Sequence, residues 1–225
     1  MPVNPEIPPV LVFAVGNESR GDDALGPSLL RKLNVWLNSG EGRREKREGF
    51  VDQFELLEDF QLQIEHALDM KDRRLLLFID AGMETPTPFS FYRAQPGQAP
   101  VLYSHALTPE ALLKVYTQFY QKNPPDMFVL CIRGASFELG EPPSPAATIH
   151  LAQAQAFVQQ LLLEPDATSW DRLCTTSILN PQSSILNPEF SILNSQSRLD
   201  TSRATCSQRQ PPAASPAPRS AHLPR

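Results

Sequence analysis

The sequence has few cysteines, no long apolar run and no excess of basic charge, and each shortage excludes a class of protein. Its three cysteines, Cys131, Cys174 and Cys206, follow no recognisable spacing, which excludes a disulfide scaffold and a cysteine-rich zinc site. No stretch approaches the roughly 18 apolar residues of a transmembrane helix. The first nine residues also lack the basic and apolar segments of a secretory signal. We therefore expect a cytoplasmic protein in a reducing environment, without a membrane as partner.

Charge is unevenly distributed along the chain. The net charge of the 225 residues is −5. Residues 166–225 hold six arginines against four acidic residues, so residues 1–165 carry −7. An acidic body with a mildly basic end argues against nucleic acid as the main partner.

The character of the sequence changes near Pro165. Three seven-residue repeats, each beginning Ser-Ile-Leu-Asn, run from Ser177 to Ser197, and a proline- and alanine-rich segment follows them. Pro181 and Pro188 exclude a coiled coil, and three such short copies cannot form a solenoid. We therefore predict one domain over residues 1–165 and a low-complexity, disordered tail over residues 166–225, whose removal should leave folding and activity intact.

Apolar runs and amphipathic stretches alternate within the predicted domain. Continuous or loosely alternating apolar runs predict strands, and residues recurring at three- and four-residue intervals predict helices. Thr108-Pro109 and Ser144-Pro145 are each an N-cap followed by proline, which marks a helix start. The predicted strands are residues 10–15, 49–57, 75–79, 89–93 and 127–132, of which 89–93 is expected at an edge of the sheet. The predicted helices are residues 22–37, residues 60–68, one beginning at Thr108 and one beginning at Ser144. The expected apolar faces of the second and fourth helices are Phe60, Ile64, Ala67 and Leu68, and Ile149, Ala152, Ala156 and Phe157.

This order of elements predicts the fold class. Strands alternating with helices are typical of a three-layer α/β domain, here with a mostly parallel, twisted five-stranded sheet and helices on both faces. In such sheets the functional site lies beyond the carboxyl ends of the strands. The residues of interest are therefore those that follow Val15, Ile79 and Ile132.

A glycine-bounded acidic loop follows the first strand. It contains Gly16, Asn17, Gly21, Asp22, Asp23 and Gly26. One interpretation is ordinary: Asp22 caps the next helix, and Asp23 favours the positive end of the helix dipole. Several functional motifs are excluded. Position 18 is Glu, so there is no dinucleotide-binding fingerprint, and the Gly-Lys-Ser/Thr of a phosphate loop, the Gly-x-Ser-x-Gly of serine hydrolases and the His-Glu-x-x-His of zinc proteases are absent.

Two more polar residues belong with this loop. Asp80 ends the third strand, where a carboxylate is costly unless it faces a crevice or finds a partner. His105 precedes the helix that begins at Thr108. Either residue taken alone fits a structural role. Together with Asp23, however, they can reach one crevice, and two carboxylates with one imidazole suit a divalent transition metal such as Ni²⁺ with coordination positions left open.

The same residues resemble the hydrogenase maturation endopeptidases. The resemblance covers about residues 10–163 and rests on Gly16-Asn17 through Gly26, Asp80-Ala81 and Ser104-His105, together with Gln61–Ala67 and Phe137–Gly140. Within that family the sequence is most similar to the branch that serves bidirectional, NAD-linked nickel–iron hydrogenases. The twisted, helix-flanked sheet of the family agrees with the fold predicted above.

The resemblance implies an activity and a set of site residues. Members of the family remove a C-terminal extension from the hydrogenase large-subunit precursor once nickel is loaded, and they recognise that nickel. The implied ligands here are Asp23, Asp80 and His105, with the nickel carried by the substrate rather than held tightly by the enzyme. Asp23 stands where the family often has the longer Glu. The precursor is then the partner, and we expect the enzyme to act as a monomer.

The mechanism and two rival functions stay open at this point. Asp23 or Asp80 is a candidate general base, and the substrate's metal is a candidate for polarising the scissile carbonyl or activating water. Asp22 is a candidate for orienting the loop, and Arg133 for binding a peptide carboxylate unless it is simply a surface residue. The rivals are a noncatalytic nickel-binding chaperone for hydrogenase assembly and, less favoured, a small-molecule α/β hydrolase.

Overall fold

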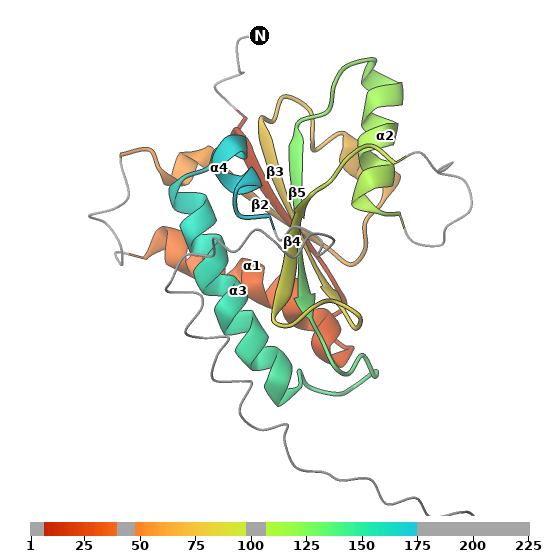
Figure 1. Ribbon diagram of the computed structural model, residues 1–225, viewed down its shortest axis with the longest axis vertical. Coiled ribbons are helices and arrows are strands. Elements are labelled where there is room, and N and C mark those ends of the chain that lie inside the picture. Colours follow the sequence, from red (N-terminus) through yellow and green to blue (C-terminus); the bar gives the residue numbers. More distant parts are fainter. Residues whose placement is uncertain (1–6, 40–47, 98–106, 175–225) are drawn as a thin grey trace, which may run out of the picture. The chain divides into compact units, whose positions relative to one another are not determined.

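The computed structural model describes residues 7–39, 48–97 and 107–174. Figure 1 shows a central sheet with helices on both of its faces. The strands of the described part are β1 (Val10–Val15), β2 (Phe54–Asp59), β3 (Leu75–Gly82), β4 (Phe89–Arg93) and β5 (Asp126–Arg133). Its helices are α1 (Leu25–Asn38), α2 (Pro109–Tyr120), α3 (Pro145–Leu163) and α4 (Ala167–Asp171), with short 3-10 helices η1 (Gly21–Ala24), η2 (Val51–Gln53) and η3 (Ile64–Ala67) between them.

The sheet confirms the predicted fold class. Its strand order is β2-β1-β3-β5-β4, and every pairing is parallel except that of β4 with β5. The fully apolar runs form the interior strands β1, β3 and β5, because strands buried on both faces need side chains that are apolar on both. The more alternating run of residues 89–93 forms an edge strand, as its pattern indicated.

Each face of the sheet carries its own apolar core. Helices α1 and α3 cover one face, and α2 covers the other (Figure 1). Because side chains alternate along a strand, β1 contributes to both cores. Its residues Val10, Val12 and Ala14 face α1 and α3, whereas Leu11, Phe13 and Val15 face α2.

The segment after β2 differs from its prediction. Residues 60–68 form a single 3-10 turn, η3, rather than a helix, and the side chains of Phe60, Ile64 and Leu68 are more than half exposed. The buried contacts of this segment come from Leu62, Ala67 and Met70 instead, whose spacing is not that of one α-helical face. The strand before it was also misplaced, because Val51–Gln53 forms a 3-10 turn and β2 begins at Phe54.

The buried face of α3 was predicted in the wrong orientation. Ser144 caps the helix as expected, accepting a hydrogen bond from the Ala147 N–H. Ile149, however, is exposed, as are Ala152 and Ala156. Alanine and leucine surround most of this helix, so periodicity alone did not single out one side. The face that packs on the core is Ala147, Leu151, Ala154, Phe157, Val158, Leu161 and Leu162.

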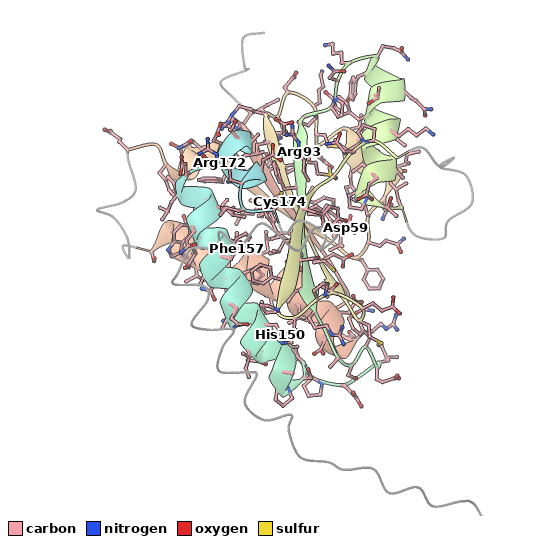
Figure 2. All side chains as sticks on the ribbon, viewed as in Figure 1. Asp59, Arg93, His150, Phe157, Arg172 and Cys174 are labelled. Atoms are coloured by element: carbon pink, nitrogen blue, oxygen red, sulfur yellow. The ribbon has the colours of Figure 1, made fainter. Side chains whose placement is uncertain are left out.

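The predicted domain boundary at Pro165 is wrong for the nine residues that follow it. Helix α4 places Trp170 in the core with no exposed surface, and its indole N–H donates to the carbonyls of Leu161 and Glu164. Arg93 of β4 forms an ion pair with Asp171 of α4 and lies next to Cys174 (Figure 2). The predicted tail beyond residue 174 lies outside the described residues.

None of the helices formed by the described residues combines the length and the apolar character that crossing a membrane requires.

Candidate functional site

Polar side chains form a row across the carboxyl ends of the strands. Asp59 of β2 pairs with Val15 of β1, and Asp80 of β3 pairs with Cys131 of β5. Between them, Ala14 of β1 pairs with Ile79, the residue before Asp80. The residues two positions earlier in β1, β3 and β5 belong to the core under α2, so this row faces the same side. The sheet topology thus places Asp80, a predicted site residue, at the edge of the sheet where the functional sites of α/β proteins lie.

The loop after β1 needs its glycines because the chain folds back tightly. Gly16 has φ +149°, and a Cβ atom there would stand 2.0 Å from the carbonyl oxygen of Asp23. At Gly26, in the first turn of α1, a Cβ atom would stand 2.5 Å from the carbonyl oxygen of Val15. Both contacts involve backbone that cannot move aside. The glycines therefore let η1 lie directly over the end of β1, with Asp23 next to Asn17.

Asp23 and Asp80 lie close to each other at this edge. The backbone N–H of Asn17 donates to Oδ2 of Asp23 at 3.1 Å. Asp80 accepts the N–H of Ala81 at 2.7 Å. Burial raises the pKa of Asp80 to about 6 against the effect of that hydrogen bond, and the negative charge of Asp23 raises it further. The structure thus brings together two of the predicted site residues, and the raised pKa of Asp80 means that its carboxyl group ionises at a higher pH than an ordinary aspartate.

Asp22 points away from this pair and does not cap α1. Its carboxylate is fully buried and accepts hydrogen bonds from the N–H groups of Ala135, Ser136 and Ser144 and from the Ser144 hydroxyl. Burial would raise the pKa of Asp22, but these hydrogen bonds outweigh it and hold the pKa below its usual value. The capping interpretation was therefore wrong, and the idea that Asp22 orients the loop is supported by its contacts.

Arg133 is half-buried and has a hydrogen-bond partner within the fold. Its guanidinium donates to the carbonyl oxygen of Thr85 at 2.9 Å. Thr85 is itself buried, and its hydroxyl lies 2.8 Å from the thiol of Cys131. Arg133 therefore ties down the loop that follows Asp80, and its proposed role in binding a peptide carboxylate has no support in these contacts.

One pair of site residues escaped the sequence analysis. Nδ1 of His66 accepts the N–H of Gln63, so the ring proton sits on Nε2 and is donated to Oδ2 of Asp59 at 3.1 Å. The His66 ring is buried against Phe13. Asp59 is the last residue of β2, whereas β3 continues two residues beyond Asp80 to Gly82. The signal at Asp59 was lost because the strand was predicted to stop at residue 57.

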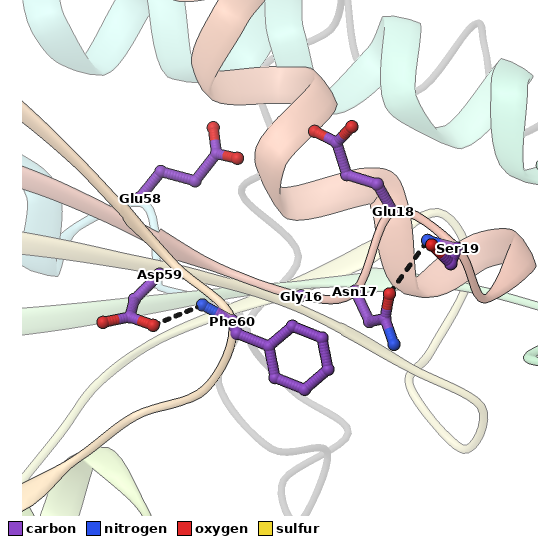
Figure 3. A pocket seen from close by; sticks show the side chains of 7 residues that line it. All are labelled: Gly16, Asn17, Glu18, Ser19, Glu58, Asp59 and Phe60. Atoms are coloured by element: carbon purple, nitrogen blue, oxygen red, sulfur yellow. Dashed lines mark hydrogen bonds between the residues drawn. The ribbon is translucent and has the colours of Figure 1, made fainter.

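An open pocket of about 560 Å³ adjoins the row. It lies where the loop after β1 meets the end of β2 (Figure 3). Arg31 of α1 forms ion pairs with Glu18 and Glu58 on its rim. Its lining residues are Gly16, Asn17, Glu18, Ser19, Glu58, Asp59 and Phe60.

The third predicted ligand, His105, lies outside the described residues, three positions before the N-cap Thr108 of α2. Within the described part of the chain, no three histidine, cysteine, aspartate or glutamate side chains converge as a metal-binding group. The described carboxylates Asp23 and Asp80 are therefore an incomplete metal site by themselves.

No model of a known protein family matches the sequence, and no curated protein matches it. Solved structures with a similar fold exist. One is the [NiFe] hydrogenase maturation protease HycI from Thermococcus kodakarensis KOD1, at 16% identity over 69% of this chain and 92% of that chain, with a TM-score of 0.51. Another is the hydrogenase maturating endopeptidase HybD from E. coli, at 20% identity over 69% and 93%, with a TM-score of 0.51. A third is an endopeptidase from Escherichia coli, at 21% identity over 69% and 93%, with a TM-score of 0.50.

At these identities the similarity establishes the shared fold. It spans nearly the whole of each of those chains and about two thirds of this one. What the site does must be argued from its own residues.

Proposed function

We propose that this protein is an endopeptidase that removes a C-terminal extension from the large-subunit precursor of a nickel–iron hydrogenase after nickel insertion. The observation that carries the proposal is the carboxylate pair Asp23 and Asp80 at the carboxyl edge of the sheet. The proteins of similar fold, which are named as maturation proteases, and the glycine-bounded acidic loop support it.

The chemistry of this pair fits the reaction. Two nearby carboxylates repel each other, and a cation between them would relieve both the repulsion and the cost of burying Asp80. Carboxylate oxygens with one imidazole suit nickel, so we propose Asp23, Asp80 and His105 as the residues that contact the nickel of the precursor. The alternative role for Asp80 is that of general base without a metal bound to it, and its raised pKa, about 6, suits that role near neutral pH.

The open pocket beside Gly16 offers room for the polypeptide that is cut. It adjoins the carboxylate pair through the loop that carries Asn17. We propose that the segment next to the scissile bond lies in it. The quoted sequence resemblance favours the precursor of a bidirectional, NAD-linked hydrogenase as substrate, and we propose that the enzyme meets it in the cytoplasm as a monomer.

The deciding experiment incubates the purified protein with nickel-loaded precursor and follows the precursor's mass. Asp23→Asn, Asp80→Asn and His105→Ala should each abolish the loss of the extension, whereas Asp23→Glu should retain it. Two matched controls should cleave normally: Asp52→Asn, an exposed acid at the opposite end of β2, and His222→Ala.

Binding of the loaded precursor without any loss of mass would contradict a protease and would fit the noncatalytic nickel-binding chaperone. Normal cleavage by Asp80→Asn would contradict the proposed role of the carboxylate pair.

A further inference from the structure

The two consecutive carboxylates of η1, Asp22 and Asp23, point in different directions. A 3-10 helix has three residues per turn, so neighbouring side chains project about 120° apart. Asp23 is half-buried and lies beside Asp80, whereas Asp22 has no exposed surface and points toward the loop after β5. The position of one carboxylate is therefore tied to the packing of the other.

Asp22 joins three parts of the chain through its two oxygen atoms. Oδ2 accepts from Ala135 N at 2.6 Å, from Ser136 N at 3.0 Å and from the Ser144 hydroxyl at 2.9 Å. Oδ1 accepts from Ser144 N at 2.6 Å. Ser144 is also the N-cap of α3, so a single carboxylate fixes η1, the loop after β5 and the start of α3 to one another.

Backbone hydrogen bonds extend this junction along both loops. Asp22 N donates to Ser136 O at 2.8 Å, Gly21 N to Glu141 O at 3.1 Å, and Gly140 N to Ser19 O at 2.7 Å. The approach at its centre is very close, since a Cβ atom on Gly134 would stand 2.9 Å from Cβ of Asp22. We call residues 19–22, 134–141 and 144 the clamp.

We propose that Asp22 is a positioning residue: through the clamp it fixes η1 so that the carboxylate of Asp23 stays on the Asn17 N–H and beside Asp80. This inference deepens the proposed function and rests on it. The reason is geometric. No side chain caps η1, and the contacts that hold it are those of Gly21 with the clamp and those of Asp23 with the turn at Gly16. An error of about 1 Å in such a site lowers turnover by about 100-fold.

Three variants separate positioning from general stability. Asp22→Asn keeps the shape but replaces one acceptor oxygen by a donor, and Ser144→Ala removes one of the four bonds to Asp22. Leu161→Ala, in the buried face at the far end of α3, lowers stability without touching the clamp. Precursor cleavage is measured well below the melting temperature of every variant. We expect Asp22→Asn to lower kcat about 10- to 100-fold with little change in KM. Ser144→Ala should have a kcat between those of Asp22→Asn and the wild type, and Leu161→Ala should keep the wild-type kcat.

A second measurement does not depend on cleavage. Hydrogen exchange of the Asn17 amide, compared with that of Val12 in β1, reports whether Asp23 still accepts its bond. Asp22→Asn should speed exchange at Asn17 selectively, and Leu161→Ala should not. Unchanged Asn17 exchange in Asp22→Asn, or wild-type kcat in that variant, would overturn the positioning role. A wild-type protein that does not cleave would contradict the proposed function, and the exchange result would still decide the role of Asp22.

Discussion

Asp80 is a carboxylate whose ionisation costs the folded protein stability. Its pKa is about 6 in the fold and 3.8 when unperturbed. Between those pH values the folded protein holds a proton that the unfolded chain releases, so the free energy of unfolding falls as the pH rises from about 4 to about 6 and stays lower above it. The difference corresponds to about 3 kcal/mol.

Asp80→Asn should therefore stabilise the protein while abolishing cleavage. Asparagine cannot ionise, yet its side-chain oxygen can still accept the Ala81 N–H. We expect the free energy of unfolding at pH 7 to rise by up to about 3 kcal/mol, with little gain at pH 4. Urea denaturation of both proteins across this pH range measures it. A variant less stable than wild type at pH 7 would show that Asp80 is a structural carboxylate.

Asp22 should show the opposite dependence on pH. Its pKa is lowered in the fold, so its contribution is fully present above the unperturbed value of 3.8 and is lost as the pH falls below it. At pH 7 Asp22→Asn should lower the free energy of unfolding by about 2–4 kcal/mol, because a buried N–H or hydroxyl is left without its charged acceptor. In the same denaturation experiments, the difference in the free energy of unfolding between Asp22→Asn and the wild type should become smaller below pH 3.8.

At the residue scale, the sequence predicted which side chains end strands but not what they contact. Asp23 and Asp80 were found because buried parallel strands end at one edge. The partners of Asp22 could not be found, since they lie 113 to 122 residues further along the chain. His105 stays a prediction. The Asp59–His66 pair required the true end of β2, which propensity alone placed two residues early.

At the scale of elements, helix α4 should be necessary for stability although the sequence around it looks like a tail. A chain ending at residue 165 loses Trp170, which is fully buried and packs against Phe91 and Phe128. We expect it to lose about 3–5 kcal/mol, the range for removing a large buried aromatic side chain. A chain ending at residue 176 should match the full-length protein within about 0.5 kcal/mol.

Thermal and urea melts of the two shortened chains measure this difference. Trp170→Ala in the chain ending at residue 176 is the matched control, and it should reproduce most of the loss. Equal stability of the two shortened chains would show that α4 contributes nothing to the core and would restore the boundary predicted at Pro165.

Elements were predicted well where a single signal decided them. Continuous apolar runs located β1, β3 and β5, and an N-cap followed by proline located the starts of α2 and α3. Predictions of the buried face failed where more than one side of a segment is apolar and tertiary packing determines which side is buried. The residues around η3 and the circumference of α3 are apolar in several directions, so only the neighbouring sheet and helices determine which side is buried.

At the scale of the whole molecule, the isolated protein should hold nickel weakly. The described residues supply two adjacent carboxylates, and His105 would add one imidazole, whereas thiolates of a loaded precursor bind nickel far more firmly. Dialysis of the purified protein should remove its nickel. Addition of about 0.1 mM Ni²⁺ should raise the free energy of unfolding by less than about 0.5 kcal/mol. Stoichiometric nickel after dialysis would contradict a substrate-borne metal.

The clamp also determines when a nascent chain can become active. Asp22 is synthesised before its hydrogen-bond donors, which are encoded 113 to 122 residues later. At about 5–20 residues per second, roughly 6–25 s of translation separate them. Throughout that interval Asp23 is synthesised but lacks the contacts that hold it in place. A partly translated chain therefore has no assembled site, and a message that ends before β5 yields a product without one.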